Sequence, residues 1–256
     1  MTQTESRTVL ITGGATRIGK EIALGLAEDG WNIAIHYNES SSEAEHLTNY
    51  IKKRGVKSIT VQANLAEYGA PERLIADVGQ KLGNIDALIN NASKFSFDSP
   101  QEFKRLNLED HMAVNLYAPM LLISEFAKQI PNGRLGCAIN LLDQKTHNLN
   151  PDFFSYTLSK IALEAATKLL ASSLGSNIRI CGLAPGITLP SGKQTDKGFE
   201  NAHKLAPLGK SSTPEDIVGG VKFLLNANAI TGTTLIVDGG QHLWPTKRDV
   251  QFEVNE

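Results

Sequence analysis

Short apolar segments alternate with longer segments of helical periodicity along almost the whole chain. The apolar segments are rich in Val and Ile and are bounded by Gly, Asn or Asp, which is typical of strands buried in a parallel sheet. The predicted strands cover residues 7–12, 31–37, 57–62, 85–90, 135–140, 178–184 and 234–239.

The longer segments between these strands carry apolar residues at the spacing of amphipathic helices. Pro131 follows one of them and Gly175 another, as expected where a helix ends. The predicted helices cover residues 18–29, 41–54, 70–82, 107–129, 153–174 and 214–227.

The repeated order of strand, helix and strand predicts an α/β fold of Rossmann type. Right-handed crossovers place helices on both faces, so we expect a doubly wound, seven-stranded parallel sheet. No linker, repeat or low-complexity segment divides the 256 residues. We therefore expect a single domain over residues 1–256, with a core over 6–243 and a C-terminal tail over 244–256. In such a sheet, ligands bind at the carboxyl ends of the strands.

Composition and charge exclude several classes of function. The chain has 41% hydrophobic residues, and its 25 Lys and Arg nearly balance 27 Asp and Glu, so we expect neither a nucleic-acid nor a membrane partner. The N-terminus lacks the pattern of a signal peptide, and no apolar run reaches the length of a membrane span. Cys137 and Cys181 lie in apolar runs without metal-site spacing, which predicts buried thiols, no metal and a cytoplasmic address.

A glycine-rich turn, TGGATRIG at residues 12–19, follows the first strand and leads into a helix. Glycines such as Gly13 and Gly19 let backbone N–H groups approach a pyrophosphate, whose charge the start of the helix favours. Arg17 within this turn could clamp a phosphate through two hydrogen bonds. The alternatives are a purely structural turn and a solvated arginine at a helix start.

The residues after the second strand bear on the choice of cofactor. A carboxylate at this strand end would hold the ribose 2′-hydroxyl of NAD and repel the 2′-phosphate of NADP. This strand ends instead at Tyr37 and Asn38, followed by a cluster of serines that begins at Ser40. Together with Arg17 this pattern favours NADP, provided that Glu39 points away from the phosphate.

The third and fourth strands are also followed by candidate ligand contacts. Asn64 and Leu65 follow the third strand, where an amide suits an adenine edge. The segment NNASKF at residues 90–95 follows the fourth, and its Phe95 could stack on a flat heterocycle. By spacing alone, a phenylalanine here is more often part of the core.

The fifth strand ends near Asp143, and the next helix carries Tyr156 and Lys160. Residues four apart share one face of a helix, so the phenol and the ammonium group can lie side by side. We expect the lysine charge to stabilise phenolate and to lower the pKa of Tyr156 from its usual value of about 10 towards neutral, as acid catalysis requires. The alternative for Asp143 is a solvated loop carboxylate.

Together these segments resemble the short-chain dehydrogenase/reductase family over residues 6–243. The resemblance implies NADP or NAD binding, catalysis by a tyrosine and a lysine, a helix asparagine at Asn115, a nicotinamide-side loop at Pro185 and Gly186, and a homotetramer. The motifs that carry it are TGGATRIG (12–19), NNAS (90–93), Asn115, YTLSK (156–160) and APG (184–186).

One departure from the family narrows the resemblance. Most members have a serine thirteen positions before the tyrosine, where this chain has Asp143. With Arg17, HYNES (36–40) and NNASKF, this makes the chain similar to the pteridine reductase branch. In that branch an aspartate, the tyrosine and the lysine form the catalytic set, and an aromatic residue at the position of Phe95 sandwiches the pterin against the nicotinamide. Two positions depart from the branch, because Glu39 stands where a basic residue is common and Asn64 where an aspartate is usual.

These motifs and this resemblance define three sets of predicted site residues. The catalytic set is Asp143, Tyr156, Lys160 and Asn115. The substrate contacts are Arg17, Ser93, Phe95, Asp143 and Tyr156. The cofactor contacts are Gly13, Arg17, Ile18, Gly19, Tyr37, Asn38, Ser40, Asn64, Leu65, Asn91, Ala92, Ser93, Tyr156, Lys160, Pro185 and Gly186.

The predicted function is an NADPH-dependent reductase of pterins, dihydropterins or dihydrofolate, with hydride transfer to a ring C=N bond. One alternative is an NADP-dependent carbonyl reductase of the 3-oxoacyl thioester or sugar-alcohol type, and another is a non-catalytic NADP-sensing scaffold. Two segments remain open: residues 189–205 are polar and suit a mobile substrate lid, whereas the tail 244–256 is either frayed or in contact with a neighbouring subunit.

Overall fold

A computed structural model describes residues 6–131, 133–190 and 195–253. Its strands form one parallel sheet in the order β3-β2-β1-β4-β5-β6-β7, which confirms the predicted doubly wound α/β fold. The strands are β1 Thr8–Ile11, β2 Asn32–Tyr37, β3 Ser58–Gln62, β4 Ala87–Asn90, β5 Gly136–Leu141, β6 Ile178–Pro185 and β7 Thr234–Val237.

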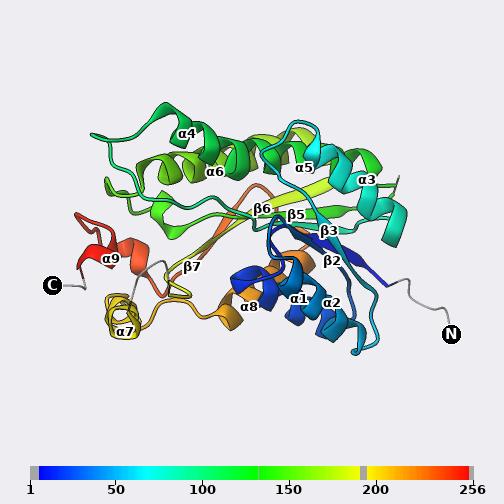
Figure 1. Ribbon diagram of the computed structural model, residues 1–256, viewed down its shortest axis with the longest axis horizontal. Helices are drawn as coiled ribbons and strands as arrows, with labels where there is room; N and C mark the ends of the chain where they lie inside the picture. Colours follow the sequence, from blue (N-terminus) through cyan, green and yellow to red (C-terminus); the bar gives the residue numbers. More distant parts are fainter. Residues whose placement is uncertain (1–5, 132, 191–194, 254–256) are drawn as a thin grey trace.

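Helices cover both faces of the sheet, as Figure 1 shows. One face packs against α1 (Arg17–Glu28), α2 (Ser41–Lys52) and α8 (Pro214–Asn226). The other packs against α3 (Ala70–Leu82), α5 (Ala118–Gln129) and α6 (Phe154–Leu174). Alternation along β1 explains how one strand serves both layers: Val9 and Ile11 lie in the first core and Leu10 in the second.

The long helix predicted over 107–129 is made of three consecutive segments. Helix α4 covers Arg105–Met112, a π-helical turn η1 covers Ala113–Tyr117, and α5 follows directly. Segments of π-helix are rare and often occur at functional sites. This one carries Asn115, which the family resemblance implies to be part of the catalytic set.

Two helices form in segments for which the sequence predicted no helix. Helix α7 (Asp196–Lys204) lies in the predicted lid, whose residues 191–194 are outside the described part of the chain. Helix α9 (Val250–Glu253) lies in the predicted tail, whose last residues 254–256 are also outside it. The two helices contact each other at one end of the molecule (Figure 1).

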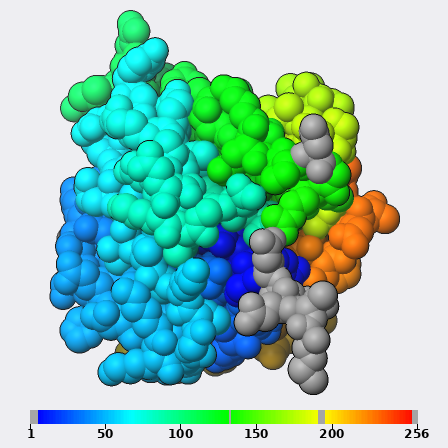
Figure 2. All heavy atoms as spheres, turned by 90° about the vertical axis from the view of Figure 1, so that its right-hand side faces the viewer, coloured from blue at the N-terminus to red at the C-terminus, as the bar shows by residue number. Residues whose placement is uncertain are grey.

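The opposite end of the molecule is formed mainly by the N-terminal half of the chain, coloured blue to cyan in Figure 2. None of the helices in the described ranges is both long enough and apolar enough to span a bilayer. The strand order reverses at β1, whose neighbours are β2 and β4. A crevice is expected at the carboxyl ends of the strands beside such a reversal.

Candidate active site

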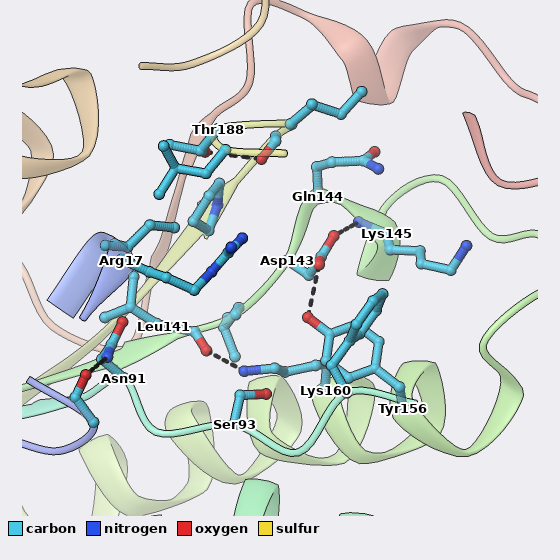
Figure 3. A pocket seen from close by; sticks show the side chains of 18 of the residues that line it. Arg17, Asn91, Ser93, Leu141, Asp143, Gln144, Lys145, Tyr156, Lys160 and Thr188 are labelled. Carbon is cyan, nitrogen blue, oxygen red and sulfur yellow. Dashed lines mark hydrogen bonds between the residues drawn. The ribbon is translucent and has the colours of Figure 1, made fainter. Parts of the chain in front are cut away.

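A cleft of about 540 Å³ opens at the carboxyl ends of the central strands. It is lined by the turn after β1, the segments after β4, β5 and β6, and part of α6 (Figure 3). Of the predicted residues, the cleft brings together Gly13, Arg17, Ile18, Gly19, Asn91, Ala92, Ser93, Phe95, Asp143, Tyr156, Lys160, Pro185 and Gly186.

Hydrogen bonds join the glycine turn to the segment after β4. The side chain of Asn91 donates to the carbonyls of Thr12 and Gly13, both at 2.9 Å, and Thr12 Oγ1 accepts the N–H groups of Asn91 and Ala92, both at 3.0 Å. A Cβ on Gly13 would lie 3.0 Å from Ala92 Cα, and one on Gly19 would collide with the Gly13 carbonyl. Glycine is therefore needed at both positions for this close approach.

His36, at the end of β2, supports the same turn and was not assigned a role from the sequence. Its Nδ1 accepts the N–H of Gly13 at 3.1 Å, and its Nε2 lies 3.0 Å from the carbonyl of Ala63. Burial lowers the pKa of His36 to about 4, partly offset by the bond to Ala63. The neutral ring, with its proton on Nε2, satisfies both bonds.

Helix α1 begins with the features of an anion site. Its N-cap residue, Thr16, makes no side-chain cap bond, and its first turn contains no acidic residue. The first N–H groups of a helix have no partner within the helix and favour negative charge. Arg17 has a φ of 51° and extends its side chain into the cleft, where Nη1 donates to the Pro190 carbonyl at 3.0 Å (Figure 3). These donors suit a pyrophosphate.

The predicted adenosine contacts lie outside the lining of this cleft. Tyr37 is half-buried at the end of β2, Asn38 is exposed and Ser40 precedes α2. Asn64 Oδ1 accepts the N–H of Ala66 at 3.1 Å, so its amide carbonyl already has one partner.

Two further observations concern the same region. Leu65 is buried, which makes it a packing residue as well as a candidate contact. Glu39 is exposed. Its exposure is compatible with the expectation that it points away from a bound phosphate.

Asp143 and Tyr156 form a hydrogen-bonded pair inside the cleft. The Tyr156 hydroxyl donates to Asp143 Oδ2 at 2.7 Å, and Asp143 Oδ1 accepts the N–H of Lys145 at 2.8 Å. The Lys160 ammonium group donates to the Leu141 carbonyl at 2.6 Å and lies 5.7 Å from the centre of the Tyr156 ring. The three predicted residues are thus brought together, with the carboxylate rather than the ammonium group bonded to the phenol (Figure 3).

The expectation that the pKa of Tyr156 is lowered towards neutral is wrong for this geometry. Burial, and then the charge and hydrogen bond of Asp143, raise the pKa of Tyr156 well above 10. Burial also raises the pKa of Asp143, although its bonds to Lys145 and Tyr156 oppose the rise. The pKa of Lys160 is lowered to about 8 by burial, against the attraction of Asp143. The site therefore holds a proton between two oxygens.

Asn115 makes hydrogen bonds to two segments that line the cleft. Its Oδ1 accepts the N–H of Lys94 at 2.7 Å and the hydroxyl of Ser93 at 3.2 Å. Its Nδ2 donates to the Lys94 carbonyl and to Ser159 Oγ, both at 2.9 Å. Asn115 thus joins the segment after β4 to α6 immediately beside Lys160.

Phe95 lies at the cleft and is not a core residue, since 43% of its surface is exposed. Its ring stacks on Phe153 with centroids 4.4 Å apart, and it lies nearly perpendicular to the Tyr156 ring with centroids 4.7 Å apart. An exposed ring held in this way offers an apolar surface next to the proton-bearing pair.

The cleft also contains residues that the sequence did not suggest. They come from three segments: the residues after β5, the residues after β6 and the C-terminal region. They include Gln144, Lys145, Thr188, Gln241, Asp249, Val250 and Gln251.

The chain matches a family model and a large group of known proteins. The model described as enoyl-(acyl carrier protein) reductase matches residues 13–242. The chain is 31% identical over 243 residues to the 3-oxoacyl-[acyl-carrier-protein] reductase of Staphylococcus epidermidis, with 93% of this chain and 100% of that protein covered.

Among solved structures, the chain resembles two proteins named FolM alternative dihydrofolate reductase 1, both in complex with NADP. The Brucella suis protein is 39% identical with a TM-score of 0.90, over 94% of this chain and 97% of that one. The Brucella canis protein is 38% identical with a TM-score of 0.88, over 94% and 96%.

Proposed function

The chain belongs to the short-chain dehydrogenase/reductase family, and from this premise we propose that it is an NADPH-dependent reductase of dihydropterins. The observation that carries the proposal is the hydrogen bond of 2.7 Å from Tyr156 to Asp143, at the position where most of the family has a serine. An aspartate there favours a substrate that has a ring nitrogen over a simple carbonyl.

NADP(H) is the cofactor, and the two FolM structures contain NADP. The residues around the glycine turn fit this group, because the start of α1 and Arg17 offer donors to phosphates. The Lys160 ammonium group lines the same cleft and would hold a ribose hydroxyl. Pro185 and Gly186 line the same cleft, and we assign them to its nicotinamide side. When bound, NADPH supplies the hydride.

The reduction converts a ring C=N bond into a C–N bond with one new C–H and one new N–H bond. The hydride goes to carbon, so the protein delivers a proton to the adjacent nitrogen. A carboxyl whose pKa is raised by burial, and which shares a hydrogen bond with a phenol, is suited to that delivery. A carboxylate facing a carbonyl oxygen would instead repel the charge that develops there.

Phe95 gives the flat ring a surface to stack on. Its partly exposed ring lies beside the catalytic pair, and stacking against aromatic rings contributes about 0.5–1.5 kcal/mol beyond burial. Ser93 and Arg17 lie in the same cleft and complete the proposed contacts of the pterin.

A second candidate is a 3-oxoacyl thioester reductase, because curated relatives with that activity are 31% identical over 93% of the chain. The two functions call for different residues at position 143. A serine there would serve a carbonyl substrate, whereas this chain has Asp143. The non-catalytic scaffold is a third candidate, and it predicts NADPH binding without turnover.

An NADPH-oxidation assay with dihydrobiopterin, dihydromonapterin, dihydrofolate and an acetoacetyl thioester separates the candidates. Turnover of one or more pterins, with little of the thioester, supports the proposal. Turnover of the thioester alone would refute it, and tight NADPH binding without any turnover would favour the scaffold.

A further inference from the structure

We propose that the C-terminal segment, residues 244–253, is the substrate-specificity wall of the active site. It fits a compact ring with a short polar side chain and restricts longer substituents. This inference deepens the proposed function and rests on it for the choice of substrates. Residues 244–253 are not a frayed tail, because three sets of contacts hold them against the rest of the chain.

Asp249, Val250 and Gln251 line the cleft together with Asp143 and Tyr156. Val250 is buried, and Asp249 is among the charges that raise the pKa of Tyr156. The segment therefore lies close enough to the catalytic pair to meet a substrate bound there.

The first set of contacts centres on Asp152, which is only 3% exposed. Its carboxylate accepts hydrogen bonds from Arg248 Nε at 2.8 Å and from the backbone N–H of Asp249 at 2.7 Å. These bonds lower the pKa of Asp152 although burial raises it, so the carboxylate keeps its charge. A buried carboxylate is satisfied here largely by the C-terminal segment.

The second set centres on Lys145, also 3% exposed. Its ammonium group donates to Asp249 Oδ2 at 2.9 Å and to Asn150 Oδ1 at 2.5 Å. Removing Asp249 would leave a buried cation with one partner fewer, which is costly. The pair holds the Asp249 end of the wall beside the cleft.

The third set is aromatic. Phe252 stacks on Phe153 with centroids 6.2 Å apart and meets Phe97 at 5.5 Å. Phe153 in turn stacks on Phe95 at 4.4 Å. The C-terminal segment is thus in contact, through one ring, with the residue proposed to stack on the substrate.

In all three sets, the partners of the C-terminal segment lie within residues 145–153, with Phe97 as the one exception among the residues named. This stretch connects Asp143 to Tyr156. Asn148, in the same stretch, adds a further bond by donating to the Trp244 carbonyl at 3.1 Å. The wall is therefore fixed to the connector that carries the catalytic pair. Because the wall is fixed before the substrate arrives, a substituent that extends past the ring must displace it, whereas a short polar side chain need not.

The test compares Arg248→Gln with Arg54→Gln. Both arginines pair with a carboxylate and lie over an aromatic ring, but Arg54 pairs with Glu28 and lies over Tyr50, away from the cleft. The measured quantity is the ratio of kcat/KM for dihydrobiopterin to kcat/KM for dihydrofolate, whose aminobenzoyl-glutamate group is long. We expect the ratio to fall about fivefold or more in Arg248→Gln and to stay unchanged in Arg54→Gln.

Phe252→Ala, with the exposed Phe223→Ala on α8 as its control, gives an independent reading if Arg248→Gln folds poorly. An unchanged ratio in a folded Arg248→Gln or Phe252→Ala protein would overturn the inference.

The two proposals fail in distinguishable ways. If the wild-type protein turns over only thioesters, the proposed function is wrong. The same variants are then compared with acetoacetyl-N-acetylcysteamine and acetoacetyl-CoA, and an unchanged ratio of short to long thioester overturns the wall. Absence of turnover with both classes would overturn both proposals.

Discussion

The backbone N–H of Gly13 donates to Nδ1 of His36 at 3.1 Å, which ties the glycine turn to the end of β2. His36 can accept this bond only while the ring is neutral. Its pKa, lowered by burial to about 4, keeps it neutral over the physiological range. The shape of the cofactor turn therefore depends on a buried histidine next to the predicted adenosine contacts.

This pair predicts a dependence of stability on pH. The unfolded chain binds a proton at His36 near the usual pKa of 6.5 and the folded chain only near about 4, so acidification favours unfolding between these values. The loss attributable to His36 is about 3 kcal/mol. Urea unfolding of His36→Gln from pH 7 to pH 4 should show a smaller loss than wild type. The exposed His46→Gln is the control, and equal losses in wild type and His36→Gln would contradict the prediction.

The lowered pKa of Lys160 predicts that kcat/KM falls at alkaline pH. Its pKa is about 8, because burial disfavours the charge. Above that pH the amine becomes neutral and no longer stabilises negative charge near Tyr156, so kcat/KM should fall about tenfold per pH unit. In Lys160→Arg the charge persists, and the decline should disappear although the absolute rate is lower. A wild-type profile that stays flat from pH 7 to 10 would refute this role.

The Arg17 side chain predicts the affinity of the cleft for the cofactor. Loss of its charged donors in Arg17→Gln should raise the Kd for NADPH about tenfold or more, and the Kd for NADH by a similar factor because both cofactors carry the pyrophosphate, as measured by fluorescence titration. Arg73→Gln is a matched control, because Arg73 also donates to a backbone carbonyl, that of Tyr68, but lies on α3. An unchanged Kd for NADPH in Arg17→Gln would argue against a role of Arg17 at the pyrophosphate.

The hydrogen bonds of Asn115 predict that replacing this residue lowers both the stability and the activity of the protein. Asn115→Ala leaves both backbone polar groups of Lys94 without their side-chain partner, which should cost about 2–3 kcal/mol in the free energy of unfolding. The segment carrying Ser93 and Phe95 is then less well fixed, so KM for the substrate should rise. A variant with wild-type stability and kinetics would show that this bonding is dispensable.

The sequence predicted the sheet, most of the helices and the approach of Asp143 to Tyr156, because periodicity and spacing are local properties. It did not predict the direction of the Tyr156 pKa, which depends on the burial of the site and then on the charge and hydrogen bond of Asp143. The wall was missed for a related reason. Lys145 and Asp249 are 104 positions apart, and only the folded chain shows that they meet.

The role of Asp143 can be tested with conservative variants. Asp143→Asn keeps the size and one acceptor but cannot carry the shared proton, and Asp143→Ser restores the residue common in the family. Both should bind NADPH as wild type does, because Asp143 is proposed to contact the substrate and not the phosphates. A large loss of NADPH affinity would place its effect elsewhere.

The most direct test of the pterin reductase account is NADPH oxidation by wild type and Asp143→Ser, each with dihydrobiopterin and with an acetoacetyl thioester. We predict that wild type reduces the pterin and that Asp143→Ser loses this activity about a hundredfold, as expected when a catalytic acid or base is removed. Wild-type turnover of the thioester alone, or pterin reduction that is untouched in Asp143→Ser, would contradict the account.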